Sequence, residues 1–281
     1  MHTRQTSGTL RFATRFRDFC AAWIATLRAH ERSQSVRIDL RWLRPRRRAD
    51  PRIAAQILDA LGDATTVLNV GAGTGNCEPT DRTVLGVEPA RTLIRQRTPT
   101  AAPVVRSVAE HLPFVADQFD AALAVLTVHH WLNLDAGLRE LRRVARRQVV
   151  FFFDAAITAQ FWALEYFNEA LSVPSETNAP DATWIGRVLD IRGVRVAPVP
   201  SDCTDGFGAA YWARPEAYLD PAVHASMSCL AQLSPAALER ATERLGADLN
   251  SGAWDDRDGH LRTMDELDAG YRIAISDITP S

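Results

Sequence analysis

The sequence contains no lysine, so arginine supplies all 32 of its basic side chains. With 34 acidic residues the formal net charge is -2, and this near balance gives no overall attraction toward nucleic acid or anionic lipid. The four cysteines, Cys20, Cys77, Cys203 and Cys229, form no CxxC pair. We therefore predict no metal site and no disulfide framework, and we expect a reducing cytoplasm. The abundance of arginine and alanine is typical of a GC-rich, bacterial coding sequence.

Long hydrophobic runs are also missing. No apolar stretch reaches the roughly 18 residues that a membrane-spanning helix needs, so we predict no membrane span. The length of 281 residues suits one large α/β domain with an extra lobe. We divide the chain into an N-terminal helical arm, residues 1–50, and a main domain, residues 51–281.

The arm is rich in arginine and poor in acidic residues. Four aromatic side chains recur in it at helical spacing: Phe12, Phe16, Phe19 and Trp23. This pattern predicts a helix that covers the active site, although it is also typical of a mitochondrial presequence. The basic run at residues 44–48 is bracketed by Pro45 and Pro51, and we interpret it as a solvated linker. It could instead contact a phosphate or an acidic substrate.

From Pro51 onward, short apolar runs alternate with helical patterns. A first helix ends at Gly62, and later helices are predicted at residues 90–96, 134–146, 217–230 and 234–249. Strands are predicted at residues 65–70, 84–87, 103–106, 119–127, 148–153, 194–199 and 271–275. The alternation predicts an α/β fold with a doubly wound, seven-stranded, mostly parallel sheet of the Rossmann-like type. Ligands of such sheets bind beyond the carboxyl ends of the strands.

Within the main domain we expect three parts. Residues 51–154 would form the ligand-binding core, and residues 191–281 would supply the strands and helices that complete the sheet. Residues 155–190 form an aromatic-rich insert, which we expect to cap the site and exclude water. Phe161 and Trp162 in the insert, with Tyr211 after it, are candidate substrate contacts.

A glycine loop, Gly71-Ala72-Gly73-Thr74-Gly75, follows the first strand directly. Because glycine has no Cβ, its backbone can approach a ligand closely. The spacing is GxGxG and not the GxGxxG of dinucleotide-binding folds, whose third glycine would fall at Asn76. An NAD-linked oxidoreductase is therefore a disfavoured alternative. Glu88 ends the second strand, where a carboxylate can accept both hydroxyls of a ribose.

Four segments of the chain resemble the motifs of class I S-adenosylmethionine-dependent methyltransferases. Val67–Gly75 looks like the first motif and Val87-Glu88-Pro89 like the second. Ala109–Phe114 resembles the AExLPF signature of the subgroup that includes the quinone-biosynthesis methyltransferases. Residues 119–131 resemble that subgroup's next strand and its HH turn. The resemblance covers residues 53–153 and implies S-adenosylmethionine as the cofactor.

The resemblance also implies a role for each matching residue. Gly71, Ala72 and Gly73 would lie against the methionine portion of the cofactor, and Leu126 would lie near its amino group. Glu88 would hold the ribose hydroxyls. The remaining contacts would be to adenine: the backbone N–H of Ala109 at the ring edge and Pro89 near the ring face.

Two positions depart from the family pattern. Asn69 stands where the family usually has aspartate, so the charge that would attract the cofactor's ammonium group is missing. Val108 stands where aspartate or serine is common, which removes the usual partner of the adenine amino group unless Glu110 replaces it. Each change should weaken cofactor binding by about 1–3 kcal/mol if the lost hydrogen bond is buried.

His129 and His130 are the candidate general bases, because they follow the fourth strand beside the expected methyl position. Either could instead pack structurally or only line the pocket. Trp131 is a further candidate substrate contact, which could form a wall near the sulfonium, with ordinary core packing as the alternative.

We therefore predict an enzyme that methylates a small, apolar or aromatic metabolite, with no nucleic acid or membrane partner, acting as a monomer or homodimer. The first alternative is a non-catalytic S-adenosylmethionine-binding sensor or scaffold, for which the changes at Asn69 and Val108 leave room. A second alternative is an RNA methyltransferase that docks through residues 44–48.

Overall fold

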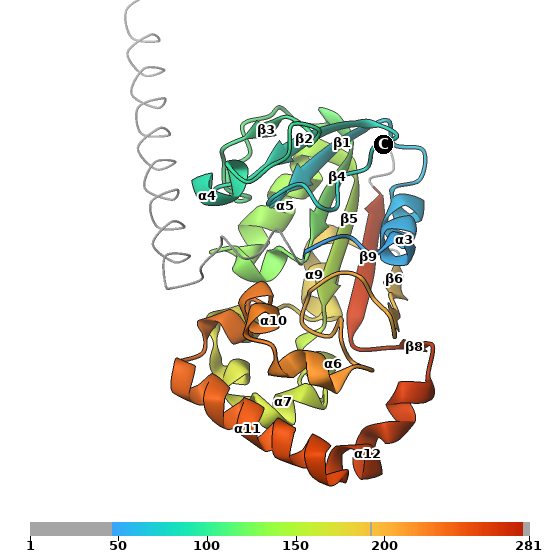
Figure 1. The fold of residues 1–281 in the computed structure, drawn as a ribbon. Coiled ribbons are helices and arrows are strands. Elements are labelled where there is room, and N and C mark those ends of the chain that lie inside the picture. The colour runs from blue at the N-terminus through green and yellow to red at the C-terminus, as the bar shows by residue number, and fades with distance from the viewer. Residues whose placement is uncertain (1–46, 192, 278–281) are drawn as a thin grey trace, which may run out of the picture.

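The computed structural model describes residues 47–191 and 193–277, and Figure 1 shows how their elements are arranged. The predicted N-terminal arm lies outside the described residues, apart from residues 47–50. Every helix in the described ranges is too short or too polar to cross a bilayer.

Seven strands form one sheet in the order β3-β2-β1-β4-β5-β9-β6. Their bounds are β1 (Thr66–Val70), β2 (Thr83–Val87), β3 (Val104–Val105), β4 (Phe119–Val125), β5 (Ala145–Phe153), β6 (Gly193–Val196) and β9 (Tyr271–Asp277). Strands β3, β2, β1, β4 and β5 are parallel neighbours, whereas β9 runs antiparallel to both β5 and β6. The predicted seven-stranded, mostly parallel sheet is confirmed.

Helices cover both faces of this sheet. Helix α3 (Pro51–Leu61) packs its apolar side on one face, together with Val149 and Phe151 of β5. Helices α5 (Leu134–Val144) and α9 (Ala182–Leu189) pack on the other face, against Val150 and Phe152. Successive side chains of β5 therefore point to opposite faces, and both sets are buried because helices lie on each side. The short helix α4 (Arg91–Ile94) follows β2.

The remaining elements gather at one end of the sheet as a second lobe (Figure 1). The part between β5 and α9 consists of α6 (Ala155–Thr158), α7 (Ala163–Tyr166), the 3₁₀ helix η3 (Asn168–Ser172) and α8 (Pro174–Thr177). The part between β6 and β9 consists of β7 (Val199–Pro200), η4 (Pro215–Leu219), α10 (Pro221–Ser226), η5 (Leu230–Gln232), α11 (Pro235–Ser251), α12 (Ala253–Asp258), η6 (Gly259–Thr263) and β8 (Glu266–Leu267). We call these elements the cap lobe.

Proline explains two differences from the predicted elements. The strand predicted at residues 194–199 ends at Val196, because Pro198 has no N–H with which to continue the ladder, and β7 pairs with β8 instead. The helix predicted at residues 217–230 is divided into η4, α10 and η5. Pro221 begins α10, and Asp220 caps it by accepting the N–H of Ala222 at 2.8 Å.

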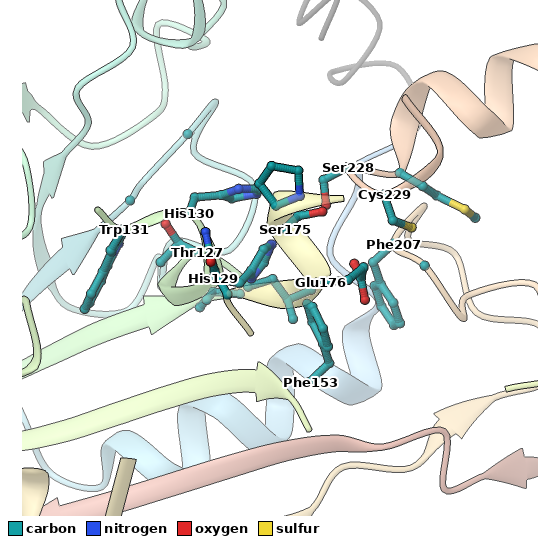
Figure 2. Close-up of a pocket in the computed structure, with 18 of the residues that line it drawn as sticks. Thr127, His129, His130, Trp131, Phe153, Ser175, Glu176, Phe207, Ser228 and Cys229 are labelled. Carbon is teal, nitrogen blue, oxygen red and sulfur yellow. The ribbon is translucent and has the colours of Figure 1, made fainter. Parts of the chain in front are cut away.

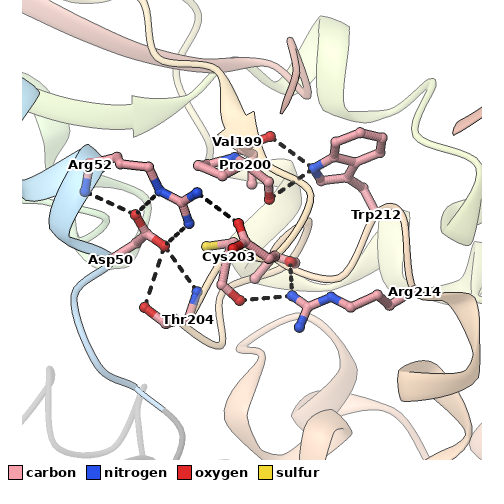
Figure 3. A network of polar contacts seen from close by, with 10 residues as sticks. Asp50, Arg52, Val199, Pro200, Cys203, Thr204, Trp212 and Arg214 are labelled. Atoms are coloured by element: carbon pink, nitrogen blue, oxygen red, sulfur yellow. Dashed lines mark hydrogen bonds and ion pairs between the residues drawn. The ribbon is translucent and has the colours of Figure 1, made fainter. Parts of the chain in front are cut away.

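A polar network ties the start of α3 to the loop that follows β7 (Figure 3). The buried Asp50 carboxylate accepts hydrogen bonds from Arg52 Nη2 at 2.8 Å and from the Thr204 backbone N–H at 3.0 Å. The Trp212 indole N–H donates to the Val199 carbonyl at 2.8 Å, and Arg214 donates to the Cys203 carbonyl at 2.7 Å. The chain before α3 is therefore held against the cap lobe.

Candidate functional site

A cavity of about 730 Å³ opens where the carboxyl ends of β1, β2 and β4 face the cap lobe. This volume is typical of small-molecule sites, which span roughly 300–1,000 Å³. Predicted residues that line its sheet side are Asn69, Gly71, Ala72, Gly73, Glu88, Pro89, Ala109, Leu126, His129, His130 and Trp131. The cap side is lined by Phe161, Phe167, Ser175, Glu176, Phe207 and Tyr218 among others.

The glycine loop can form only because its glycines adopt left-handed backbone angles. Gly71 has a φ of 76° and Gly73 a φ of 53°. A Cβ placed on Gly71 would lie 2.0 Å from the Thr127 hydroxyl oxygen, so no side chain fits there. The backbone N–H of Gly71 donates to the Val87 carbonyl at 2.8 Å, which fixes the loop beside β2.

Glu88 points toward the glycine loop. One carboxylate oxygen accepts the Gly73 N–H at 2.9 Å, and the other accepts the Ala90 N–H at 2.8 Å. The side chain is only 4% exposed, and burial raises the pKa of Glu88 to about 7 despite these two hydrogen bonds. The acid and the loop therefore form one surface of the cavity, in the arrangement expected for a ribose site.

The two departures from the family pattern have different local structures. Asn69 is among the residues that line the cavity, and its side-chain oxygen is buried without a hydrogen-bond partner among the described residues. Val108 is fully buried and offers no polar group, although its neighbour Ala109 lines the cavity.

Glu110 does not line the cavity, which corrects its predicted place beside adenine. Its carboxylate turns toward the start of α5, where one oxygen accepts the Asn133 N–H at 3.1 Å. The side chain thus satisfies a backbone donor next to the helix N-terminus.

His129 and His130 lie on the 3₁₀ helix η2 (Val128–His130), at the middle of the cavity in Figure 2. The His129 ring lies 4.0 Å from the His130 ring and 4.9 Å from the Phe153 ring, measured between centroids. Its Nδ1 is buried without a partner among the described residues. Burial, with a smaller contribution from His130, holds the pKa of His129 well below its usual value, so the imidazole is neutral near pH 7.

Leu126 and Trp131 both belong to the segment after β4. Leu126 has a φ of 47°, which is strained for a side chain of this size, and such strain often accompanies a functional site. Trp131 covers Gly137 of α5 so closely that a Cβ there would lie 2.3 Å from its ring. Both residues line the cavity.

Of the four predicted aromatic substrate contacts, Trp131 and Phe161 line the cavity. The Trp162 indole N–H donates to the Trp212 carbonyl at 3.0 Å, and its ring packs 5.2 Å from that of Trp254. The Tyr211 ring lies under the guanidinium of Arg214, 4.8 Å from the ring centroid. The predictions for Trp162 and Tyr211 are wrong, because both rings pack within the cap lobe.

Several cavity residues were missed by the sequence analysis. Arg47 lines the cavity and donates through Nε to Asp205 at 2.8 Å, so interpreting this residue as part of a solvated linker was wrong. Phe207 and Glu176 of the cap lobe also line the cavity. The basic run was the sequence signal for Arg47, and no sequence signal distinguishes Glu176 from the other acids of the insert.

Comparisons with known proteins agree with this geometry. Residues 68–153 match a family described as a methyltransferase domain. A solved structure from Anabaena variabilis, of a proposed methyltransferase from an antibiotic biosynthesis pathway, is 28% identical with a TM-score of 0.74. The match covers 82% of this chain and 98% of that one. An uncharacterised protein of Methanocaldococcus jannaschii is 32% identical over 97 residues, 34% of this chain, and the match spans only 39% of that relative.

Proposed function

We propose that this chain, which is a class I S-adenosylmethionine-dependent methyltransferase, transfers the methyl group to a small apolar or aromatic metabolite. One observation carries the proposal. The same cavity is lined on its sheet side by the glycine loop, Glu88 and His129, and on its cap side by aromatic rings such as Phe161 and Phe207.

The residues of the sheet side fit the cofactor. Glu88 would accept the two ribose hydroxyls, and the unpartnered oxygen of Asn69 would accept an N–H from the methionine ammonium. Gly71 and Gly73 leave room for the methionine portion because they carry no Cβ. When bound, S-adenosylmethionine supplies a methyl group on a positively charged sulfur, which is a leaving group already in place.

The chain's main contribution to catalysis would be positioning. Fixing the acceptor atom in line with the methyl group can lower the barrier by about 7–11 kcal/mol. The neutral His129 would accept a hydrogen bond from an acceptor hydroxyl or amine and orient its lone pair. Burial disfavours a charged imidazole, so the acceptor proton would be passed on to His130 and not retained by His129.

Other features support a small acceptor. A net charge of -2 does not favour nucleic acid. From the absence of a CxxC pair in the sequence we also propose a reducing, cytoplasmic setting. We also propose that residues 155–190 act as the cap that excludes water from the reaction.

The test combines binding with turnover. Titration calorimetry should show that S-adenosylhomocysteine binds the full chain and that Glu88→Ala abolishes this binding. Incubation with methyl-labelled cofactor and a bacterial metabolite extract should label a small molecule. Tight cofactor binding with no methyl transfer in any extract would instead favour a non-catalytic sensor of S-adenosylmethionine. The observation behind this alternative is that Asn69 and Val108 lack two contacts that are usual in the family.

A further inference from the structure

Glu176 places a carboxyl group in the acceptor half of the cavity. It belongs to α8, which packs against η2, the helix that carries His129. In Figure 2 the Glu176 carboxyl points into the same space as Phe153, Phe207 and His129. The acid therefore belongs to the cap side of the cavity, together with the aromatic ring of Phe207.

This carboxyl group has no ion-pair partner within residues 47–191 and 193–277. Burial raises the pKa of Glu176 to about 7, and only a hydrogen bond with the Ser175 hydroxyl opposes that rise. Arg47 also lines the cavity, but Asp205 already neutralises it at 2.8 Å. A partly buried carboxylate without a counter-ion is disfavoured, and a ligand that supplies a positive charge would offset that cost.

The surroundings of Glu176 also suit a cation on an apolar body. The Phe207 and Tyr271 rings line the cavity with their centroids 4.6 Å apart, and Phe153 lines it beside His129. Aromatic faces attract an ammonium group, by about 0.5–2 kcal/mol in typical sites, and they also pack against an apolar ring. Carboxylate and rings together form a site for an amine attached to a hydrophobic group.

We infer that Glu176 determines acceptor specificity by pairing with a protonated amine on an aromatic or apolar acceptor. This inference rests on the proposed methyl-transfer function. The paired nitrogen is an anchor and not the methylated atom, because a protonated nitrogen has no lone pair with which to attack. The methylated atom would then lie at the other end of the acceptor, near His129.

Two other ligand chemistries are possible at a carboxyl group in such a pocket. A neutral hydroxyl could donate a hydrogen bond to Glu176 without carrying charge. An acceptor with its own carboxylate would be repelled by an ionised Glu176. Three probes of similar shape separate these cases: phenethylamine, phenethyl alcohol and hydrocinnamate.

The experiment measures the affinity of each probe by calorimetry for the full chain saturated with S-adenosylhomocysteine. We expect phenethylamine to bind at least tenfold more tightly than phenethyl alcohol, and hydrocinnamate to bind most weakly. Glu176→Gln keeps the shape of the side chain and should remove the preference for the amine. The exposed Glu239 of α11 offers a matched control, and Glu239→Gln should leave all three affinities unchanged.

Several outcomes would overturn the inference. These are equal affinity for amine and alcohol, no amine binding at millimolar concentration, or an amine preference that survives in Glu176→Gln. S-adenosylhomocysteine binding is measured in the same samples, and its retention shows that the variant is folded. If the full chain fails to bind S-adenosylhomocysteine at all, the proposed function itself is wrong, so the two failures are distinguishable.

Discussion

The Glu88 carboxylate accepts the backbone N–H of Gly73 at 2.9 Å, so the acid that ends β2 directly contacts the loop that follows β1. This contact joins two parts of the predicted cofactor site in one buried pair. The hydrogen bond from Gly73 holds the Glu88 carboxyl group in this orientation. Burial raises the pKa of the same group to about 7.

Cofactor affinity should depend on pH through Glu88. Ribose hydroxyls donate to the ionised carboxylate, so protonation below about pH 7 competes with binding. We expect the affinity for S-adenosylhomocysteine to fall as the pH decreases, by up to about tenfold for each unit below that pKa. Calorimetry between about pH 5 and pH 8 measures this, and Glu88→Gln should bind weakly with a flat profile. An equally steep profile in the variant would assign the dependence to another group.

The same carboxyl group should make the cofactor-free protein less stable at high pH. A pKa raised by folding favours the protonated form in the native state, so the stability it contributes is lost as the pH rises from about 4.5 to about 7. One unit of pKa corresponds to about 1.4 kcal/mol, so the loss is on the order of 3 kcal/mol. In urea unfolding, the stability of Glu88→Gln relative to the unmodified chain should increase over this range. A constant difference between the two proteins would contradict the assignment.

Gly71→Ala should destabilise the protein strongly. The new Cβ would lie 2.0 Å from the Thr127 hydroxyl oxygen, and alanine is strained at a φ of 76°. We expect a loss of about 3 kcal/mol or more in the free energy of unfolding. Gly73→Ala is the matched control, because its φ is also positive but a Cβ there meets nothing within 4 Å. The control should lose only about 1 kcal/mol of unfolding free energy. Equal losses in the two variants would show that Thr127 moves aside and that its contact with the new Cβ costs nothing.

Asp50 should stabilise the junction between α3 and the cap lobe. Replacing it with asparagine removes charged hydrogen bonds from Arg52 and Thr204, which should cost about 1–3 kcal/mol of unfolding free energy. Hydrogen bonds from Arg52 hold the pKa of Asp50 below its usual value, so this stabilisation is present near neutral pH and is lost as the pH falls. Thermal unfolding should show a gap between the two proteins that narrows toward low pH. Asp202→Asn, at an exposed partner of Arg52, should change the melting temperature far less.

The sheet could be predicted from the sequence because its strands are buried on both faces and appear as short, continuous apolar runs. The cofactor half of the site could be predicted for a related reason, since the glycine loop and Glu88 follow those strands directly. The cap lobe could not be predicted in the same way. Elements such as α7 and α8 are four residues long, too short for a helical period to show.

Long-range packing decided most of the remaining errors. Trp162 is an aromatic residue near the predicted site, but its ring packs against Trp254 far along the chain. The Tyr211 ring has a local partner instead, the guanidinium of Arg214. Arg47 enters the cavity through an ion pair with Asp205, which is 158 residues away in sequence. Sequence spacing carries no information on such partners.

The position of β9 between β5 and β6 affects how the protein acquires its native state. Phe153 at the end of β5 pairs with Tyr271 at the start of β9. The chain between these two residues contains the cap lobe, so the antiparallel ladder forms only after the ends of this long segment have come together. Until then β5 exposes a hydrophobic edge that could pair with another chain. Because Phe153 and Tyr271 both line the cavity, a partly folded chain that lacks this ladder also lacks a complete binding site.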